Sequence, residues 1–183
     1  AFALFREYKD RPFSGWRLDE ILAVPYIIPE LFRSPDMRDF VRESVRRGMI
    51  PVVVWYNIPD GGESYTRNLE HIQDPGYMRG YYEDLAFAID LANEEAGDEP
   101  VVWVLEPDFI GYMAQNNENP RTLVARTDAA YEVGALDPET DPVFPNTMRG
   151  MIEAVNYLLA NRSNNAVFGW QFDLWAFPAG GWD

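Results

Sequence analysis

One pattern recurs in this chain: an amphipathic helix, a glycine that ends it, and a short run of apolar, often β-branched residues. The first copy begins at Ser34-Pro35-Asp36, stops at Gly48 and leads into residues 49–56. Serine is a preferred N-cap, proline suits the first helical position, and glycine commonly follows a helix. The apolar run has no polar alternation. We therefore predict a strand that is covered on both faces.

A second copy follows, with a helix that begins at Asp74, ends at Gly97 and precedes the strand Val101-Val102-Trp103-Val104-Leu105. The other predicted elements are two helices, at residues 122–134 and 146–161, and two strands, at residues 167–174 and 21–28. Pro25 and Pro29 argue against a central position for the last of these strands.

Strands joined by helical crossovers lie parallel in one sheet, with the helices packed outside. The sequence therefore predicts an α/β fold. Three or four strands are too few for a closed eight-stranded barrel, so the chain is either a small open sheet or part of a barrel. We expect residues 1–183 to be one α/β domain within a larger, distorted barrel-like fold, and residues 137–145 to form a long surface loop.

Composition removes several classes of protein. The chain has 47% hydrophobic and 15% aromatic residues, too many for a disordered chain, and its net charge of −15 disfavours nucleic acid as a partner. It has no cysteine and one histidine, so neither a disulfide framework nor a multi-histidine metal site is expected, and no cofactor is predicted. No apolar stretch approaches the ~20 residues that cross a bilayer. The strong acidity is typical of a secreted or a halophilic protein, and we expect a secreted or extracellular location; the oligomeric state is left open.

Acids and aromatic residues gather after the predicted strands, where ligands bind in parallel α/β folds. They are Trp55, Tyr56, Asp60, Glu63, Glu106, Asp108, Asp173, Trp175 and Trp182. Paired carboxyl groups suit glycosidic bond cleavage, which needs a protonated acid and an ionised carboxylate. Indole rings suit the apolar faces of sugars. Any single acid could instead cap a helix or bind a loop, and Trp55 or Trp175 could belong to the core.

Three stretches occur in an order that resembles glycoside hydrolase family 6. They are Val54-Trp55-Tyr56-Asn57-Ile58-Pro59-Asp60, Val104-Leu105-Glu106-Pro107-Asp108-Phe109-Ile110 and Gln171-Phe172-Asp173-Leu174-Trp175-Ala176. They are similar to family stretches of the types D-L-P-D-R-D, E-P-D-S-L and Y-L-D-A-G-H. The resemblance covers about residues 49–182. It implies a distorted parallel barrel and inverting hydrolysis of a cellulose-like β-1,4-glucan.

The resemblance also implies roles for individual residues. Asp108 matches the general acid, and Asp60 or Glu63 would tune its proton or orient water. The expected substrate-binding residues are Trp55, Tyr56, Glu106, Asp173, Trp175 and Trp182. Gly61 and Gly62 follow Asp60 where the family has a second aspartate. This departure keeps open an alternative function, a catalytically inactive carbohydrate-binding or assembly module. Endo or exo action, the sugar and the catalytic base are also open.

Overall fold

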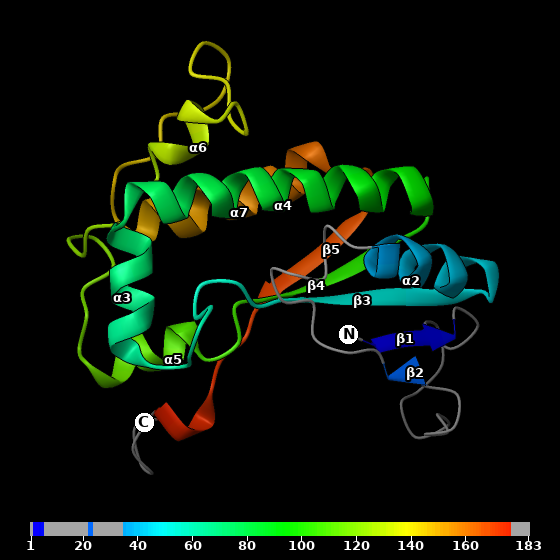
Figure 1. The fold of residues 1–183 in the computed structure, drawn as a ribbon, viewed down its shortest axis with the longest axis horizontal. Helices are drawn as coiled ribbons and strands as arrows, with labels where there is room; N and C mark the ends of the chain where they lie inside the picture. The colour runs from blue at the N-terminus through cyan, green and yellow to red at the C-terminus, as the bar shows by residue number, and fades with distance from the viewer. Residues whose placement is uncertain (1, 6–21, 24–34, 177–183) are drawn as a thin grey trace, which may run out of the picture.

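The computed structural model describes residues 2–5, 22–23 and 35–176 (Figure 1). Their elements are β1 (Phe2–Phe5), β2 (Leu22–Ala23), α2 (Pro35–Arg46), β3 (Met49–Trp55), α3 (Tyr65–Gln73), α4 (Pro75–Ala96), β4 (Val101–Leu105), α5 (Phe109–Gln115), α6 (Ala129–Glu132), α7 (Met148–Arg162), β5 (Ala166–Trp170) and the 3-10 turn η4 (Leu174–Ala176).

The strands form one open sheet in the order β2-β1-β3-β4-β5. The last three strands are parallel, and Trp103 of β4 pairs with Val53 of β3 and Phe168 of β5. This confirms the predicted parallel neighbours and the α/β class. The described strands are not closed into a barrel, because the sheet keeps two separate edges. Next to β3 lies β1, which pairs antiparallel and so adds no further β/α repeat.

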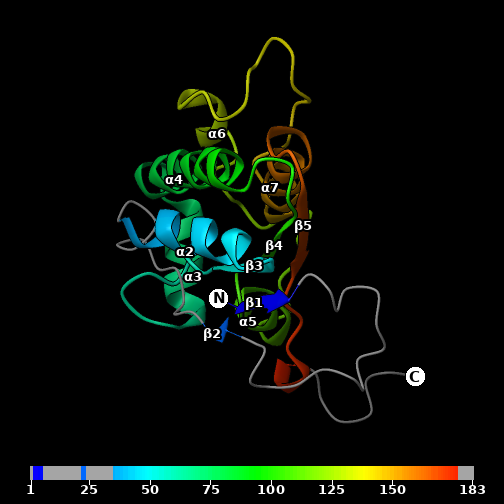
Figure 2. The same cartoon turned by 90° about the vertical axis from the view of Figure 1, so that its right-hand side faces the viewer.

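Helices cover one face of the sheet. Helices α2, α4 and α7 lie together on that face (Figure 2). Alternate residues of the strands point toward them, so Val53, Trp55 and Trp103 belong to the same buried cluster as the apolar side of α4. The intervening valines belong to the opposite face, where Val167 of the edge strand β5 is 58% exposed.

The observed boundaries of the helices and strands show which of them capping residues and apolar patterns in the sequence could predict. Helix α4 begins after Asp74, whose side chain accepts from the Tyr77 N–H, and ends at Gly97, as predicted. At residues 122–134, however, the structure has only the short α6 and turns. Helix α7 and strand β5 fall within two residues of the predicted starts, but β5 ends four residues early. Of the strand predicted at 21–28, only β2 lies among the described residues.

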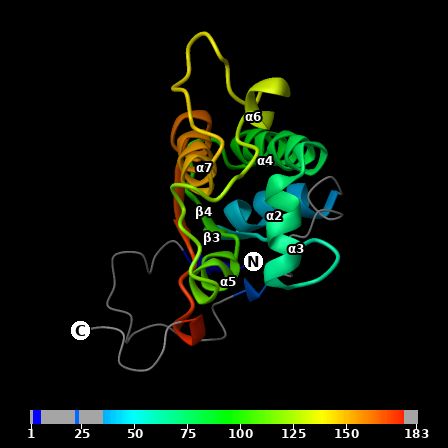
Figure 3. The ribbon, with the colours of Figure 1, turned by 90° about the vertical axis from the view of Figure 1, so that its left-hand side faces the viewer.

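Two helices at the carboxyl ends of the strands were not predicted. Helix α3 lies between the first predicted strand and the helix that begins at Asp74, and Ser64 is its N-cap. Helix α5 directly follows the Glu106-Pro107-Asp108 turn. Figure 3 views the molecule from this end, with α3 and α5 side by side and η4 next to α5. These elements position the candidate site.

Candidate functional site

Asp108 lies at the centre of the site, at the tight turn between β4 and α5. Its backbone is left-handed (φ 68°), as is that of Glu106 (φ 41°), an uncommon conformation for residues other than glycine. Strained backbone of this kind clusters at functional sites. The turn also leaves the Asp108 side chain free of a capping bond to α5. Instead, its Oδ2 accepts a hydrogen bond from the Tyr56 hydroxyl at 3.2 Å.

The surroundings of Asp108 favour its protonated form. Partial burial raises the pKa of this carboxyl, and the negative charges of Asp173 and Glu63 raise it further. Hydrogen bonds from Tyr56 and Trp175 act in the opposite direction, but the net shift is upward. A carboxyl group whose pKa is raised by neighbouring carboxylates can serve as a general acid.

Asp173 is the second carboxyl of the site and the most enclosed. It is 6% exposed, and its Oδ1 accepts from the Gln171 amide at 2.7 Å. Its Oδ2 is buried and has no hydrogen-bond partner in the structure. An ideal Cβ placed on Gly111 would lie 3.2 Å from this oxygen, so the absence of a side chain there admits Asp173 close to α5.

Aromatic rings border the two carboxyl groups. Trp175 of η4 is 49% exposed, and its ring meets that of Tyr112 edge-on at a centroid distance of 5.5 Å. Burial and the charges of Asp108, Glu63 and Asp173 all raise the pKa of Tyr112, which places its hydroxyl near the same acids. Trp175 therefore has the exposure expected of a sugar-stacking residue.

Glu106 lies behind the site and is fully buried. The Asn57 N–H reaches both of its carboxylate oxygens, at 3.2 and 3.3 Å, and the Ile58 N–H donates to Oε2 at 3.0 Å. Burial raises the pKa of Glu106 to about 8 in spite of these donors. The expected contact with substrate is incorrect for this side chain, because it faces inward. Its hydrogen bonds instead hold the loop after β3 beside the turn after β4.

The structure separates the other predicted site residues. Trp55 is fully buried against Tyr81 and Trp103, so the predicted sugar-stacking role is wrong: the ring lies on the helix-covered face of β3. Asp60 is exposed, and its charge contributes to the raised pKa of Tyr77. Glu63 is exposed too, but its charge reaches Asp108. Trp182 lies outside the described residues.

Two polar residues of the site were missed in the sequence, Tyr112 and Gln171. Tyr112 follows Asp108 by four residues, the spacing that places two side chains on one side of a helix. That signal becomes visible only once a helix is assigned after the turn. Gln171 stands two residues before Asp173, and no pattern in the sequence distinguishes it from the chain's other glutamines and asparagines.

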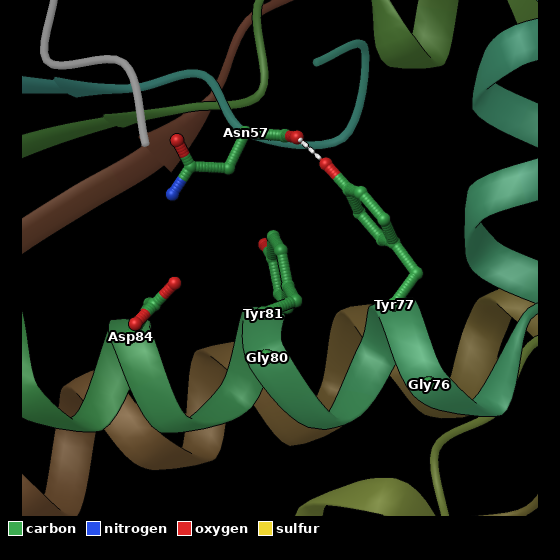
Figure 4. A pocket seen from close by; sticks show the side chains of 6 residues that line it. All are labelled: Asn57, Gly76, Tyr77, Gly80, Tyr81 and Asp84. Atoms are coloured by element: carbon green, nitrogen blue, oxygen red, sulfur yellow. Dashed lines mark hydrogen bonds between the residues drawn. The ribbon is translucent and has the colours of Figure 1, made fainter. Parts of the chain in front are cut away.

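A pocket of about 200 Å³ lies on the other side of the loop after β3, against α4. It is lined by Asn57, Gly76, Tyr77, Gly80, Tyr81 and Asp84 (Figure 4). The Tyr77 hydroxyl donates to the backbone carbonyl of Asn57, which fixes one wall. This pocket shares no lining residue with the Asp108 cluster.

The chain matches no family model, no curated protein and no solved structure. Among residues 2–5, 22–23 and 35–176, no group of three or more histidine, cysteine, aspartate or glutamate side chains could hold a metal ion. The same part of the chain contains no helix long and apolar enough to cross a membrane.

Proposed function

We propose that this protein hydrolyses glycosidic bonds of a β-1,4-linked glucan at the site around Asp108. The observation that carries the proposal is the pairing of Asp108, whose pKa is raised, with the buried carboxyl of Asp173 beside the exposed ring of Trp175. Glycoside hydrolysis needs two carboxyl groups in different protonation states. The ordered resemblance to glycoside hydrolase family 6 supplies the substrate class and inversion as its stereochemical course.

In the proposed reaction, Asp108 donates its proton to the leaving glycosidic oxygen as the bond to the anomeric carbon breaks. A water attacks that carbon from the opposite side and loses a proton. The exposed carboxylate of Glu63, whose charge reaches Asp108, is the candidate to orient this water and take its proton, while the enclosed Asp173 acts through its charge on Asp108. Tyr56 holds Asp108 through its hydroxyl. Because polymeric glucan is found outside cells, we propose a secreted or extracellular location.

The direct test uses the full chain with soluble cello-oligosaccharides and follows the release of new reducing ends. Appearance of the α-anomer first, detected by NMR, supports inverting hydrolysis of the β-linkage. Saturable binding without any release supports the alternative, an inactive carbohydrate-binding module. One observation favours that alternative: Gly61 and Gly62 follow Asp60 where the family that the chain resembles has a second aspartate. A chain that neither binds the oligosaccharide nor releases reducing ends would contradict both functions.

Trp175→Ala should weaken binding of a cello-oligosaccharide by roughly 1–3 kcal/mol, because the indole face covers a sugar ring and removes apolar surface from water. The melting temperature should change little, since the ring is about half exposed. Isothermal titration calorimetry and a melting curve measure the two quantities.

The matched control for this variant is Phe172→Ala. Phe172 is an exposed aromatic residue, 65% accessible, three positions earlier in the same segment. Its truncation should leave the affinity within about twofold if stacking is specific to Trp175. Equal losses for the two variants would show that the ring contributes only general apolar surface.

A further inference from the structure

Gly111 occupies the point where helix α5 meets the segment that contains Asp173 and Trp175 (Figure 3). It is buried, and its backbone is helical without a positive φ, so the conformation of the chain does not require glycine there. Inside a helix, glycine is less favourable than alanine, because it has more conformational freedom to lose on folding. A glycine at this position is therefore explained by its neighbours rather than by the helix.

Two side chains of the neighbouring segment come close to Gly111. An ideal Cβ built on Gly111 would lie 3.0 Å from the Cζ2 and Cη2 atoms of the Trp175 ring and 3.2 Å from Oδ2 of Asp173. Carbon atoms in van der Waals contact are normally about 3.5–4.0 Å apart. A methyl group at this position would therefore push the ring and the carboxylate away from α5. Gly80 of α4 is different, because a Cβ there would meet no atom within 4 Å.

We propose that Gly111 is a positioning residue of the candidate site, because the absence of its side chain lets Asp173 and Trp175 lie against α5 beside Asp108. In this role Gly111 does not contact the substrate, and it acts through the two side chains that pack on it. The importance of Gly111 for hydrolysis rests on the proposed function. Its effect on the positions of these side chains does not.

The position of Asp173 matters because its charge acts on Asp108. Burial is the largest cause of the raised pKa of Asp108, and the charge of Asp173 is the next. Glu63 also raises this pKa, while hydrogen bonds from Tyr56 and Trp175 lower it. If the segment moves away from α5, both leading causes weaken and the pKa of Asp108 should fall. Loss of the hydrogen bond from Trp175 acts in the opposite direction, but it is the smallest of these effects.

The experiment follows the carboxyl carbon of Asp108 by NMR in the 13C-labelled full chain as the pH is changed. The signal is assigned by its absence in Asp108→Asn. In Gly111→Ala the midpoint of the titration should move to lower pH, and Gly111→Val, which adds a larger side chain, should move it further. The pKa of the nearby Tyr112 is raised above its ordinary value of 10.0, so Tyr112 is uncharged where Asp108 titrates.

Gly80→Ala and Gly80→Val are the matched controls, since they make the same changes at an open position of α4. They should leave the midpoint of Asp108 unchanged. An unchanged midpoint in Gly111→Ala would overturn the proposal. A midpoint at higher pH would overturn it too, because Trp175 would then have moved without Asp173.

Asp173→Asn tests the route of the effect. Asparagine removes the charge, and its oxygen can still accept from the Gln171 amide. This variant alone should lower the midpoint of Asp108, and the absence of that shift would contradict the proposal without any change at Gly111. Adding Gly111→Ala to it should give a clearly smaller shift than Gly111→Ala gives in the wild-type chain. Equal shifts in the two backgrounds would show that Gly111 does not act through Asp173.

These titrations need no substrate, so their result is independent of the proposed hydrolysis. On a soluble β-1,4-glucan, the alkaline limb of the pH profile of Gly111→Ala should move to lower pH together with the midpoint. A shifted midpoint in a chain without hydrolytic activity would contradict the proposed function and leave the positioning role of Gly111 intact.

Discussion

Asp108→Asn should lower the turnover of a soluble β-1,4-glucan by about 10²–10⁴-fold, the usual contribution of a general acid. Asparagine keeps the shape of the side chain, and its oxygen can still accept from the Tyr56 hydroxyl. The ground-state affinity for oligosaccharide should therefore stay within a few-fold. Steady-state rates of reducing-end release and calorimetric binding separate the two effects.

Asp98→Asn is the control for this substitution. Asp98 is exposed and precedes β4, so it lies at the opposite end of the strand from Asp108. The Asp98→Asn substitution should leave turnover unchanged. Equal turnover of Asp108→Asn and the wild-type chain would remove Asp108 from the mechanism. Equal losses of turnover and of binding would show that the substitution disturbs the site as a whole.

The pH profile gives an independent check on the acid role. Asp108 must be protonated to donate, so the rate should fall as the pH rises through its pKa. The hydrogen bond from Tyr56 lowers that pKa by stabilising the carboxylate. Tyr56→Phe should therefore move the alkaline limb of the profile to higher pH. A shift to lower pH would contradict the assigned hydrogen bond.

The sequence was sufficient for the sheet because its parallel strands carry strong local signals. The valines of β3 and β4 have no polar alternation, and Asp74 and Gly97 mark both ends of the long helix between them. The barrel was not predictable in the same way. Whether a sheet closes depends on pairing at its edges, and here β1 pairs antiparallel with β3, far from it in the sequence.

The location of the candidate site could be predicted from the sequence, but the orientation of its side chains could not. Residues at strand ends meet at one edge, which brought Asp108 and Asp173 together from distant segments. Sequence alone could not tell on which face of the sheet the side chain at the end of each strand lies. Trp55 and Tyr56 are adjacent, yet the first enters the core and the second reaches Asp108. Glu106 likewise turns inward, where its carboxyl oxygens accept three hydrogen-bond contacts from the backbone N–H groups of Asn57 and Ile58.

The inward position of Glu106 makes the stability of the fold depend on pH. Its pKa of about 8 in the folded chain stands above the ordinary value of 4.5. Between these values the folded chain binds one more proton than the unfolded chain, so the free energy of unfolding falls as the pH rises. The stabilisation is fully present below about pH 4.5 and is lost as the pH approaches 8. One proton corresponds to about 1.4 kcal/mol per pH unit.

Glu106→Gln should remove this dependence, because glutamine does not titrate and its oxygen can still accept from the Ile58 N–H. From pH 5 to pH 8, the stability of the wild-type chain should fall relative to this variant by about 4 kcal/mol. Urea unfolding at several pH values measures the difference, and Glu139→Gln, at an exposed loop position, is the control that should run parallel to wild type. Because all other titrating groups are common to both chains, their contributions cancel in the comparison. Parallel curves for Glu106→Gln and wild type would mean that Glu106 is ionised at pH 5, and that the three N–H contacts outweigh its burial.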